Sequence, residues 1–317
     1  MQRFRHFLIC TAILLAEFGA LALFVSASSV LYLYLGVYVF ILNLLLWYVA
    51  KYYFTRSPSQ EIVSESHTDE QEQFQINIAI AKKIQTHLLP EHFLRLPKLE
   101  IYAHSRPSDE MGGDFYQLIQ ENVPLPLLAI GDVAGHGLPS AMVSVMVDTL
   151  LHAFAKAADL KSLLININDV LYQRIDPALF TTMLLLRWNS ELQHMNITSA
   201  GFGRFLHYNA REKQLYTITT KGVALGMVPS SRLSLGEVQC SLTAGDSLVI
   251  CTDGILDMRN NLGERLGMER WKEIVSRHVH EENVETMFEK ISQDLLSYAG
   301  TARQVDDITL MIMRSLC

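Results

Sequence analysis

Hydrophobic residues are concentrated at the start of the chain. Residues 7–26 and 30–50 form two nearly uncharged apolar stretches, each of about 20 residues and therefore long enough to cross a bilayer as a helix. Only residues 27–29 separate them. The pattern predicts a membrane anchor over residues 1–54 that consists of two transmembrane helices.

The charges around this anchor predict its orientation. Arg3 and Arg5 precede the first span, Lys51 and Arg56 follow the second, and the connecting turn carries no charge. By the positive-inside rule both ends of the anchor lie in the cytoplasm, so we expect a two-span protein of the inner or plasma membrane whose remaining domain is cytoplasmic. A cleaved signal peptide is the alternative, but its apolar core would be unusually long and a second span follows at once.

Residues 55–90 are interpreted as a linker followed by a helix that resembles a coiled coil. Residues 57–72 are polar and predict the linker. From 74 to 80 apolar and polar residues alternate, which is typical of a strand, whereas the positions after 80 have helical spacing. The pattern alone leaves strand and helix open for residues 74–80.

An apolar stripe follows in the helical part. Ala81, Ile84 and Leu88 share one face of a helix that Pro90 would end. Such a narrow stripe is suited to packing against the same helix of a second chain, which would form a homodimer, or against the sheet of its own domain. Both alternatives remain open at this point.

Residues 91–317 have the pattern of a soluble domain. Short apolar runs predict strands, longer amphipathic stretches predict helices, and the two do not alternate regularly. An α+β fold of antiparallel sheets covered by helices fits this order better than a doubly wound parallel sheet. Strands are predicted at 99–107, 112–120, 126–133, 179–188, 193–201, 246–254 and 307–314, and helices at 140–157, 160–174, 269–277 and 284–298.

Net charge and cysteine content narrow the class of protein. The formal net charge is -7, and nucleic acid is not expected as a partner because binding to its phosphate backbone requires a basic face. The 4 cysteines lie far apart without a C-x-x-C spacing. Neither a disulfide framework nor a structural zinc site is therefore expected.

Two aspartates are predicted to face each other across a hairpin. Asp114 begins one apolar run, Asp132 ends the next, and Asn122 and Pro124 mark a turn between the runs. A hairpin centred on Val123 places the two carboxylates opposite each other, with β-carbons about 5 Å apart. Like charges so close to a core are destabilising unless they are compensated, and a divalent cation would compensate them.

Two more apolar runs carry aspartate at an end. Asp253 follows one run, and Asp306 and Asp307 precede another. Strand ends with carboxylates at four places suggest one shared site, and oxygen ligands without a histidine pair favour Mg²⁺ or Mn²⁺ over zinc. The alternative for each aspartate alone is an ordinary turn residue.

Several motifs together resemble the stage II sporulation protein E type of serine/threonine phosphatase, a branch of the metal-dependent, protein phosphatase 2C-like (PPM) superfamily. The resemblance covers residues 80–314 and implies two stacked antiparallel sheets flanked by helices, with a site for two metal ions at one end. It also implies that the segment before Pro90 is helical. The motifs are "IAKKIQTHLLP", "GGDFY", "GDVAGHGLPSAM", "FTTMLLL", "ALGM", "TDGILD" and "DDITLMIMR".

The resemblance implies a ligand set for two Mn²⁺ or Mg²⁺ ions. Asp114, Asp132, Asp253 and Asp306 would be carboxylate ligands and act in catalysis, with the backbone carbonyl of Val133 as a further ligand. Asp132 would bridge the ions, which would share a hydroxide that attacks phosphorus. By the same resemblance Asp307 is not the ligand of its pair, and His136 is a turn residue.

Two departures from the family pattern concern residues outside this set. Gln117 stands where the family has aspartate, and Ser199-Ala200-Gly201-Phe202 replaces Asn-Ala-Gly-His. The substrate expected from the resemblance is a phosphorylated cytoplasmic signalling protein, such as a STAS-type anti-sigma-factor antagonist, dephosphorylated at phosphoserine or phosphothreonine. A membrane-tethered scaffold with weak or no activity, which binds a regulatory partner, is the alternative hypothesis.

Overall fold

The computed structural model describes residues 36, 38–39, 41–44 and 59–316. The chain divides into two compact units, Met1–Gln73 and Phe74–Cys317. The predicted spans at 7–26 and 30–50 lie outside the described residues, except for a few helical positions between 36 and 44. Across the positions that are described, we find no helix that combines the length and the hydrophobicity required to cross a membrane.

Helix α3 (Ser59–Leu88) covers most of the predicted linker and the segment after it. Residues 59–73 contain neither glycine nor proline and are rich in Glu and Gln, which favour helices. The polar segment predicted as a linker is therefore helical from Ser59 onward. Residues 74–80 are helical as well, which excludes the strand alternative.

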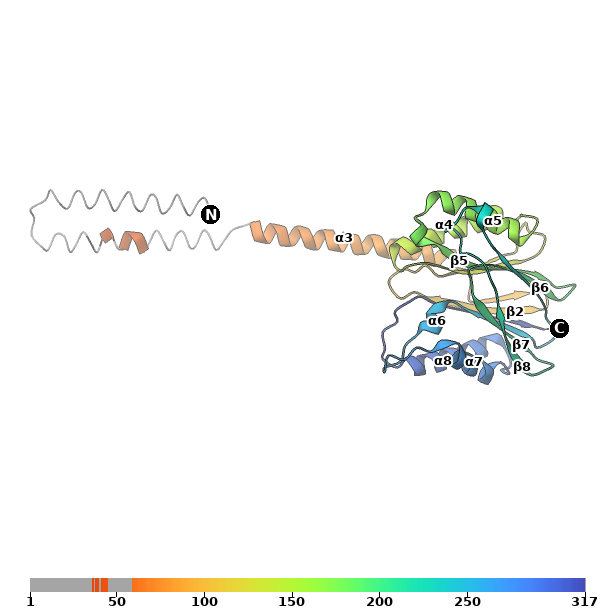
Figure 1. The fold of residues 1–317 in the computed structure, drawn as a ribbon. Helices are drawn as coiled ribbons and strands as arrows, with labels where there is room; N and C mark the ends of the chain where they lie inside the picture. Colours follow the sequence, from red (N-terminus) through yellow and green to blue (C-terminus); the bar gives the residue numbers. More distant parts are fainter. Residues whose placement is uncertain (1–35, 37, 40, 45–58, 317) are drawn as a thin grey trace, which may run out of the picture. The chain divides into compact units, whose positions relative to one another are not determined.

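The strands form two antiparallel sheets, shown as arrows in Figure 1. One sheet has the order β1-β2-β11-β10-β7-β8, and the other has the order β3-β4-β5-β6-β9. The first contains β1 (Phe93–Leu96), β2 (Leu99–Arg106), β7 (Arg204–Asn209), β8 (Gln214–Thr219), β10 (Ser247–Cys251) and β11 (Ile308–Ser315); the second contains β3 (Phe115–Ile119), β4 (Leu127–Val133), β5 (Thr181–Asn189), β6 (His194–Ala200) and β9 (Gly236–Ser241).

Helices cover the outer face of each sheet (Figure 1). Helices α4 (Leu138–Phe154) and α5 (Leu160–Arg174) pack on the five-stranded sheet, and α7 (Gly267–His278) and α8 (Val284–Ala299) pack on the six-stranded sheet. The short helix α6 (Asp253–Asp257) follows β10. Single 3-10 turns are η1 (Pro177–Leu179) and η2 (Ser230–Arg232).

Strand β10 shows why the central strands are apolar without alternation. Leu248 and Ile250 face the core between the sheets, whereas Val249 and Cys251 face the core under α7 and α8. Successive side chains point to opposite faces of a strand, so a strand that is covered on both faces requires apolar residues at every position. The α+β fold of two antiparallel sheets flanked by helices is thereby confirmed for the second unit, Phe74–Cys317.

Four strands were not predicted, namely β1, β7, β8 and β9. The edge strands β8 and β9 are mostly half-buried or exposed along their length. Polar side chains are tolerated at the edge of a sheet, so these strands lack the apolar runs on which the prediction depended.

The predicted β3–β4 hairpin is present in the predicted register. Phe115 pairs with Gly131, and Tyr116 pairs with Ile130. One step further along the same register, Asp114 lies opposite Asp132. Gly131 leaves room for the ring of Phe115, because a β-carbon at this glycine would lie 2.4 Å from Cζ of Phe115.

Candidate active site

The strand-end aspartates converge at one end of the two sheets. Asp114 precedes β3 of the five-stranded sheet, yet its Oδ2 accepts hydrogen bonds from Thr252 Oγ1 (2.7 Å) and Thr309 Oγ1 (2.6 Å). Thr252 directly follows β10, and Thr309 lies on β11 of the six-stranded sheet. The Asp114 carboxylate therefore lies between the ends of both sheets, next to the segment that carries Asp253.

The carboxylates of this site raise one another's pKa. Burial raises the pKa of Asp114 well above its usual range, and the charge of Asp132 adds to this effect, while the hydrogen bonds from the two threonines oppose it. The pKa of Asp132 is raised to about 7 by burial first, and then by the charges of Asp253 and Asp306. At Asp114, Asp132 and Asp306, burial and mutual repulsion therefore outweigh the hydrogen bonds and the nearby His136.

The donor set fits a hard cation. Among the described residues no group of three or more His, Cys, Asp or Glu side chains is arranged so that it could hold a metal ion as it stands. The electrostatic coupling nevertheless places Asp132 close to Asp114, Asp253 and Asp306. Carboxylates that repel one another without a cation are expected to draw closer around one. The side chains of these four aspartates provide only oxygen atoms as ligands, and oxygen ligands suit Mg²⁺ or Mn²⁺.

The backbone of Val133 also borders the site. A β-carbon at Gly113 would lie 2.5 Å from the carbonyl oxygen of Val133, so this oxygen is close to the residue that precedes Asp114. The absence of a side chain at Gly113 allows this approach. The predicted carbonyl ligand is thus next to the predicted carboxylate ligands.

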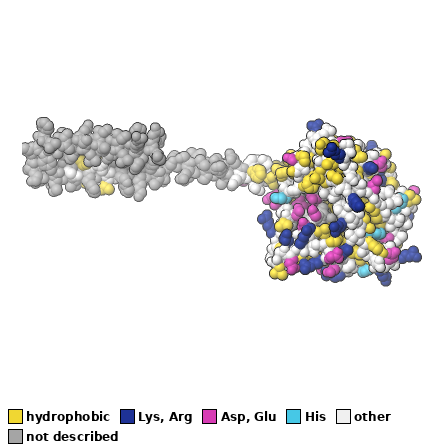
Figure 2. All heavy atoms as spheres, in the orientation of Figure 1, with side chains coloured by type: hydrophobic (Ala, Val, Ile, Leu, Met, Phe, Trp, Pro, Cys, Tyr) yellow, Lys and Arg dark blue, Asp and Glu magenta, His cyan; other side chains and the backbone are white. Residues whose placement is uncertain are grey.

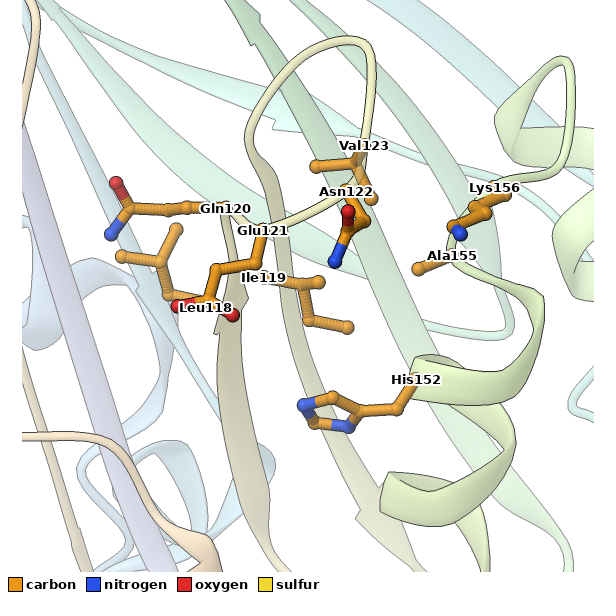
Figure 3. A pocket seen from close by; sticks show the side chains of 9 residues that line it. All are labelled: Leu118, Ile119, Gln120, Glu121, Asn122, Val123, His152, Ala155 and Lys156. Carbon is orange, nitrogen blue, oxygen red and sulfur yellow. The ribbon is translucent and has the colours of Figure 1, made fainter.

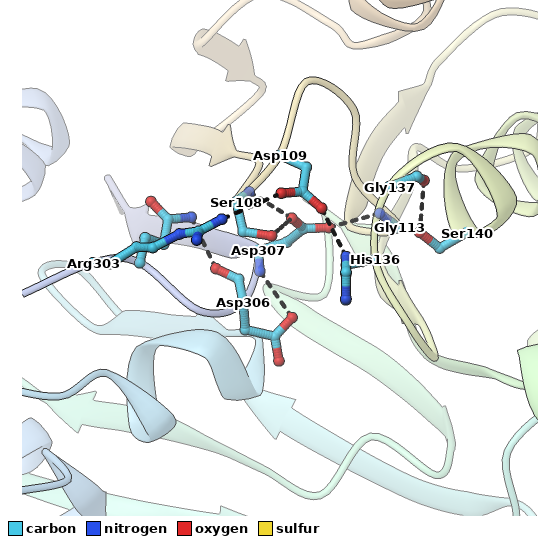
Figure 4. Close-up of polar contacts among 10 residues, drawn as sticks. Ser108, Asp109, Gly113, His136, Gly137, Ser140, Arg303, Asp306 and Asp307 are labelled. Carbon is cyan, nitrogen blue, oxygen red and sulfur yellow. Dashed lines mark hydrogen bonds and ion pairs between the residues drawn. The ribbon is translucent and has the colours of Figure 1, made fainter. Parts of the chain in front are cut away.

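Asp307 accepts hydrogen bonds from the loop that precedes Asp114 (Figure 4). Its Oδ1 accepts hydrogen bonds from the amide (2.7 Å) and hydroxyl (3.0 Å) of Ser108, and its Oδ2 accepts one from the amide of Gly113 (2.7 Å). Asp306 accepts a hydrogen bond only from the amide of Asp307 among the bonds of the described residues. The Asp306 carboxylate is therefore the one available for a further ligand.

His136 lies at the rim of the site. Its ring is mostly exposed, and Nδ1 lies 2.7 Å from Oδ2 of Asp109, toward which it points in Figure 4. Gly135 and Gly137 on either side have positive φ values of 91° and 75°, which explains the glycines of the G-H-G turn. The prediction of a turn residue agrees with this geometry, while Asp109 was missed.

The two threonines that bind Asp114 were also missed. Both belong to motifs quoted above. Thr252 begins "TDGILD" and precedes Asp253, and Thr309 lies in "DDITLMIMR", two residues after Asp307. Their buried hydroxyls satisfy a buried carboxylate oxygen, which would otherwise be costly. The threonines within "TDG" and "DDIT" are the sequence feature from which these hydrogen bonds to Asp114 could have been predicted.

The two departures from the family pattern have structural roles. Gln117 is buried, and its Nε2 donates to the carbonyl of Leu88 at the end of α3. An aspartate cannot donate this hydrogen bond. Phe202 is 5% exposed and packs in the core between the sheets. Neither residue replaces one of the aspartates of the site.

Two cavities of the domain differ in the side chains that line them. One of about 650 Å³ lies between the β3–β4 turn and the end of α4, where Glu121, His152 and Lys156 are among its lining residues (Figure 3). It lies at the opposite end of β3 from Asp114. A groove of about 510 Å³ instead has Asp132 and Asp253 in its wall. This second groove therefore adjoins the carboxylate site, whereas the first does not.

Comparison with known proteins agrees with this geometry. Residues 126–315 match the family described as Stage II sporulation protein E (SpoIIE). The chain is 27% identical over 247 residues to the phosphoserine phosphatase RsbU of Bacillus subtilis (strain 168), with 77% of this chain and 71% of RsbU covered.

Solved structures show the same fold. The SiaA-PP2C domain of Pseudomonas aeruginosa is similar with a TM-score of 0.65 at 21% identity, over 77% of this chain and 98% of that one. RsbX in complex with magnesium is similar with a TM-score of 0.52 at 17% identity, over 70% of this chain and 98% of that one. The family match covers more than half of the chain and contains three of the four strand-end aspartates. The chain belongs to the SpoIIE family of PP2C-like serine/threonine phosphatases.

Proposed function

We propose that the chain is a metal-dependent phosphatase that removes phosphate from phosphoserine or phosphothreonine of a cytoplasmic signalling protein. The observation that carries the proposal is the set of mutually repelling carboxylates Asp114, Asp132, Asp253 and Asp306 at one end of the sheets. Together with the carbonyl of Val133 they would hold two Mn²⁺ or Mg²⁺ ions. Bound ions would supply Lewis-acid stabilisation of phosphoryl charge and lower the pKa of water.

The protein's own residues position this set. Thr252 and Thr309 fix the orientation of the Asp114 carboxylate by donating hydrogen bonds to its Oδ2. Asp307 fixes the loop before Asp114 through the amides of Ser108 and Gly113. The groove beside Asp132 gives a phosphorylated side chain access to the site.

Hydrolysis of p-nitrophenyl phosphate, with added Mn²⁺ or Mg²⁺ and with a chelator, tests this proposal. We expect turnover only with metal, and we expect Asp132→Asn to reduce kcat by at least about 100-fold, because the variant loses a ligand to the catalytic ions. Asp169→Asn, at an exposed position of α5, is the matched control and should retain turnover. Equal turnover of Asp132→Asn and wild type would contradict the assignment.

The scaffold alternative makes the opposite prediction for the same assay, namely no turnover with any metal. It is supported only by the departures at Gln117 and Phe202. Gln117 donates a hydrogen bond to the carbonyl of Leu88, and Phe202 packs in the core at the wall of the groove that contains Asp132 and Asp253. Neither departure removes one of the four aspartates, so we favour the enzyme.

The expected substrate is a phosphorylated anti-sigma-factor antagonist of the STAS type. Similarity to RsbU, which is named a phosphoserine phosphatase, supports this choice. Comparing the phosphoproteome of cells that carry wild type with that of cells that carry Asp132→Asn would identify the substrate as a phosphoserine peptide that accumulates in the variant.

We also propose that two chains pair through α3. Ile76, Ile80 and Ile84 are each about half exposed, at 46%, 55% and 56%, and recur every fourth residue on one face of the helix. Of the predicted stripe, Ala81 and Leu88 are partly buried. The exposed stripe available for a second copy is therefore shifted to these three isoleucines.

A further inference from the structure

A small cavity on the Asp306 side of the site is lined by arginines. It has a volume of about 120 Å³, and Arg106, Arg259 and Arg303 contribute to its wall. Asp306 is the only carboxylate among its lining residues. Arg106 ends β2, Arg259 follows α6, and Arg303 lies between α8 and β11, so three distant segments bring positive charge to one place.

Among the described residues only one of these arginines contacts an acidic side chain, and that contact is long. Arg106 and Arg259 have no carboxylate within ion-pair distance there, and Arg259 Nη1 donates to the carbonyl of Gly263 (2.8 Å). Arg303 is 86% exposed in its side chain and reaches Asp109 only at 4.0 Å, as Figure 4 shows. If the arginines served only to offset the acidic site, we would expect direct contacts with its carboxylates.

The cavity also has an apolar wall and a fixed loop. Leu296 and Val305 are 57% and 59% exposed, and both line the cavity. Gln304 Nε2 donates to the carbonyls of Arg106 (2.9 Å) and Asp306 (2.8 Å), which ties the loop to β2. The backbone that carries Arg106 and the loop of Arg303 is thus tied in place, which lowers the entropic cost of ordering this loop on binding.

We propose that this cavity is the subsite for an acidic side chain of the phosphoprotein, located two or three residues from the phosphoserine, with an apolar neighbour against Leu296 and Val305. This inference rests on the proposed phosphatase function. In an extended segment a side chain at that spacing lies about 7–10 Å from the phosphoserine, a distance that separates neighbouring subsites. Guanidinium groups bind carboxylates through paired, charge-assisted hydrogen bonds, and Figure 2 shows basic side chains close to acidic ones on one face of the domain.

The experiment uses two synthetic phosphoserine peptides that differ only at the flanking positions, where one carries Glu and the other Gln. We expect the full-length wild type to have a higher kcat/KM for the Glu peptide. Arg303→Glu should lower the ratio of the two kcat/KM values by about fivefold or more, because an attraction is replaced by a repulsion. A third peptide with Lys at these positions should become the better substrate of Arg303→Glu.

Arg211→Glu is the matched control, since Arg211 is exposed in the β7–β8 turn and does not line the cavity. It should leave the ratio unchanged. Binding of the same peptides, measured by fluorescence anisotropy, gives the ratio independently of turnover. Wild type that binds both peptides equally, or equal ratios for Arg303→Glu and Arg211→Glu, would overturn the subsite. Discrimination in binding without hydrolysis of any peptide would instead count against the proposed phosphatase and leave the subsite standing.

Discussion

At the scale of single residues, the domain contains two buried aspartates in contrasting surroundings. Asp114 is 5% exposed and receives hydrogen bonds from two threonine hydroxyls. Asp148 on α4 is 8% exposed, and among the described residues its Oδ1 has no hydrogen-bond partner. Burial raises the pKa of Asp148, and the charge of nearby His152 offsets this only in part. Oδ1 lies 3.6 Å from Nδ1 of His152, which is too far for a hydrogen bond, and a buried carboxylate oxygen without a hydrogen bond destabilises the fold.

We therefore expect Asp148→Asn to stabilise the domain at neutral pH. A raised pKa in the folded state means that folding is disfavoured once the carboxylate ionises, and this cost is absent below the unfolded-state value of 3.8. The free energy of unfolding of the variant should exceed that of wild type by about 1 kcal/mol at pH 7. The difference should shrink as the pH falls toward 3.8. Urea unfolding at several pH values measures it, and a difference that grows on acidification would refute the explanation.

At the scale of elements, the end of α3 is attached directly beside the site. Gln85 Nε2 donates to the carbonyl of Gly112 (2.6 Å) and to Ser144 Oγ of α4 (3.0 Å). Gln117 on β3 donates to the carbonyl of Leu88. Ile80 and Ile84 in this part of α3 are exposed. The helix thus joins an apolar surface to the backbone that precedes Asp114.

We expect Ile80→Asp and Ile84→Asp to weaken self-association of the full-length protein, because each places a charge in a surface that pairing would desolvate. Lys83→Asp, at an exposed position of the same helix, is the control for an added aspartate. Sedimentation velocity in detergent should show monomers for the isoleucine variants and dimers for wild type and the control. A wild type that is monomeric at all concentrations would leave the isoleucines without a partner.

At the scale of the whole molecule, the membrane anchor remains a prediction that rests on the apolar stretches at 7–26 and 30–50 and on the flanking positive charges. An anchor with the predicted orientation would place the phosphatase domain on the cytoplasmic side of the membrane, where cytoplasmic phosphoproteins can bind to it. The turn at residues 27–29 is too short to form an external ligand-binding domain.

A reporter fused after Arg56 tests the topology. We expect cytoplasmic reporter activity. We also expect deletion of residues 1–54 to release the protein from the membrane fraction, because the deletion removes both apolar stretches that are predicted to span the membrane. Reporter activity on the outer side of the membrane would contradict the orientation, and a truncated protein that stays in the membrane would contradict the anchor.

The sequence by itself determined the longer helices of the domain, the strands with continuous apolar runs, and the register of one hairpin. Helix α5 has the bounds that were predicted, and Asp114 lies opposite Asp132 as expected from the position of the turn. These features depend on local spacing, because periodicity records which face is covered and a tight turn fixes the pairing of its strands. The convergence of the four aspartates was inferred from shared strand-end positions and from the family resemblance.

Only the tertiary structure decided which distant residues meet. Ser108 and Asp307 are 199 positions apart in the chain and hydrogen-bond to each other, and the arginine cavity gathers Arg106, Arg259 and Arg303. Both depend on the order of strands in the six-stranded sheet, where β2 lies beside β11 and β11 beside β10. Strand order is set by packing between segments, and no local pattern of hydrophobic and polar residues encodes it.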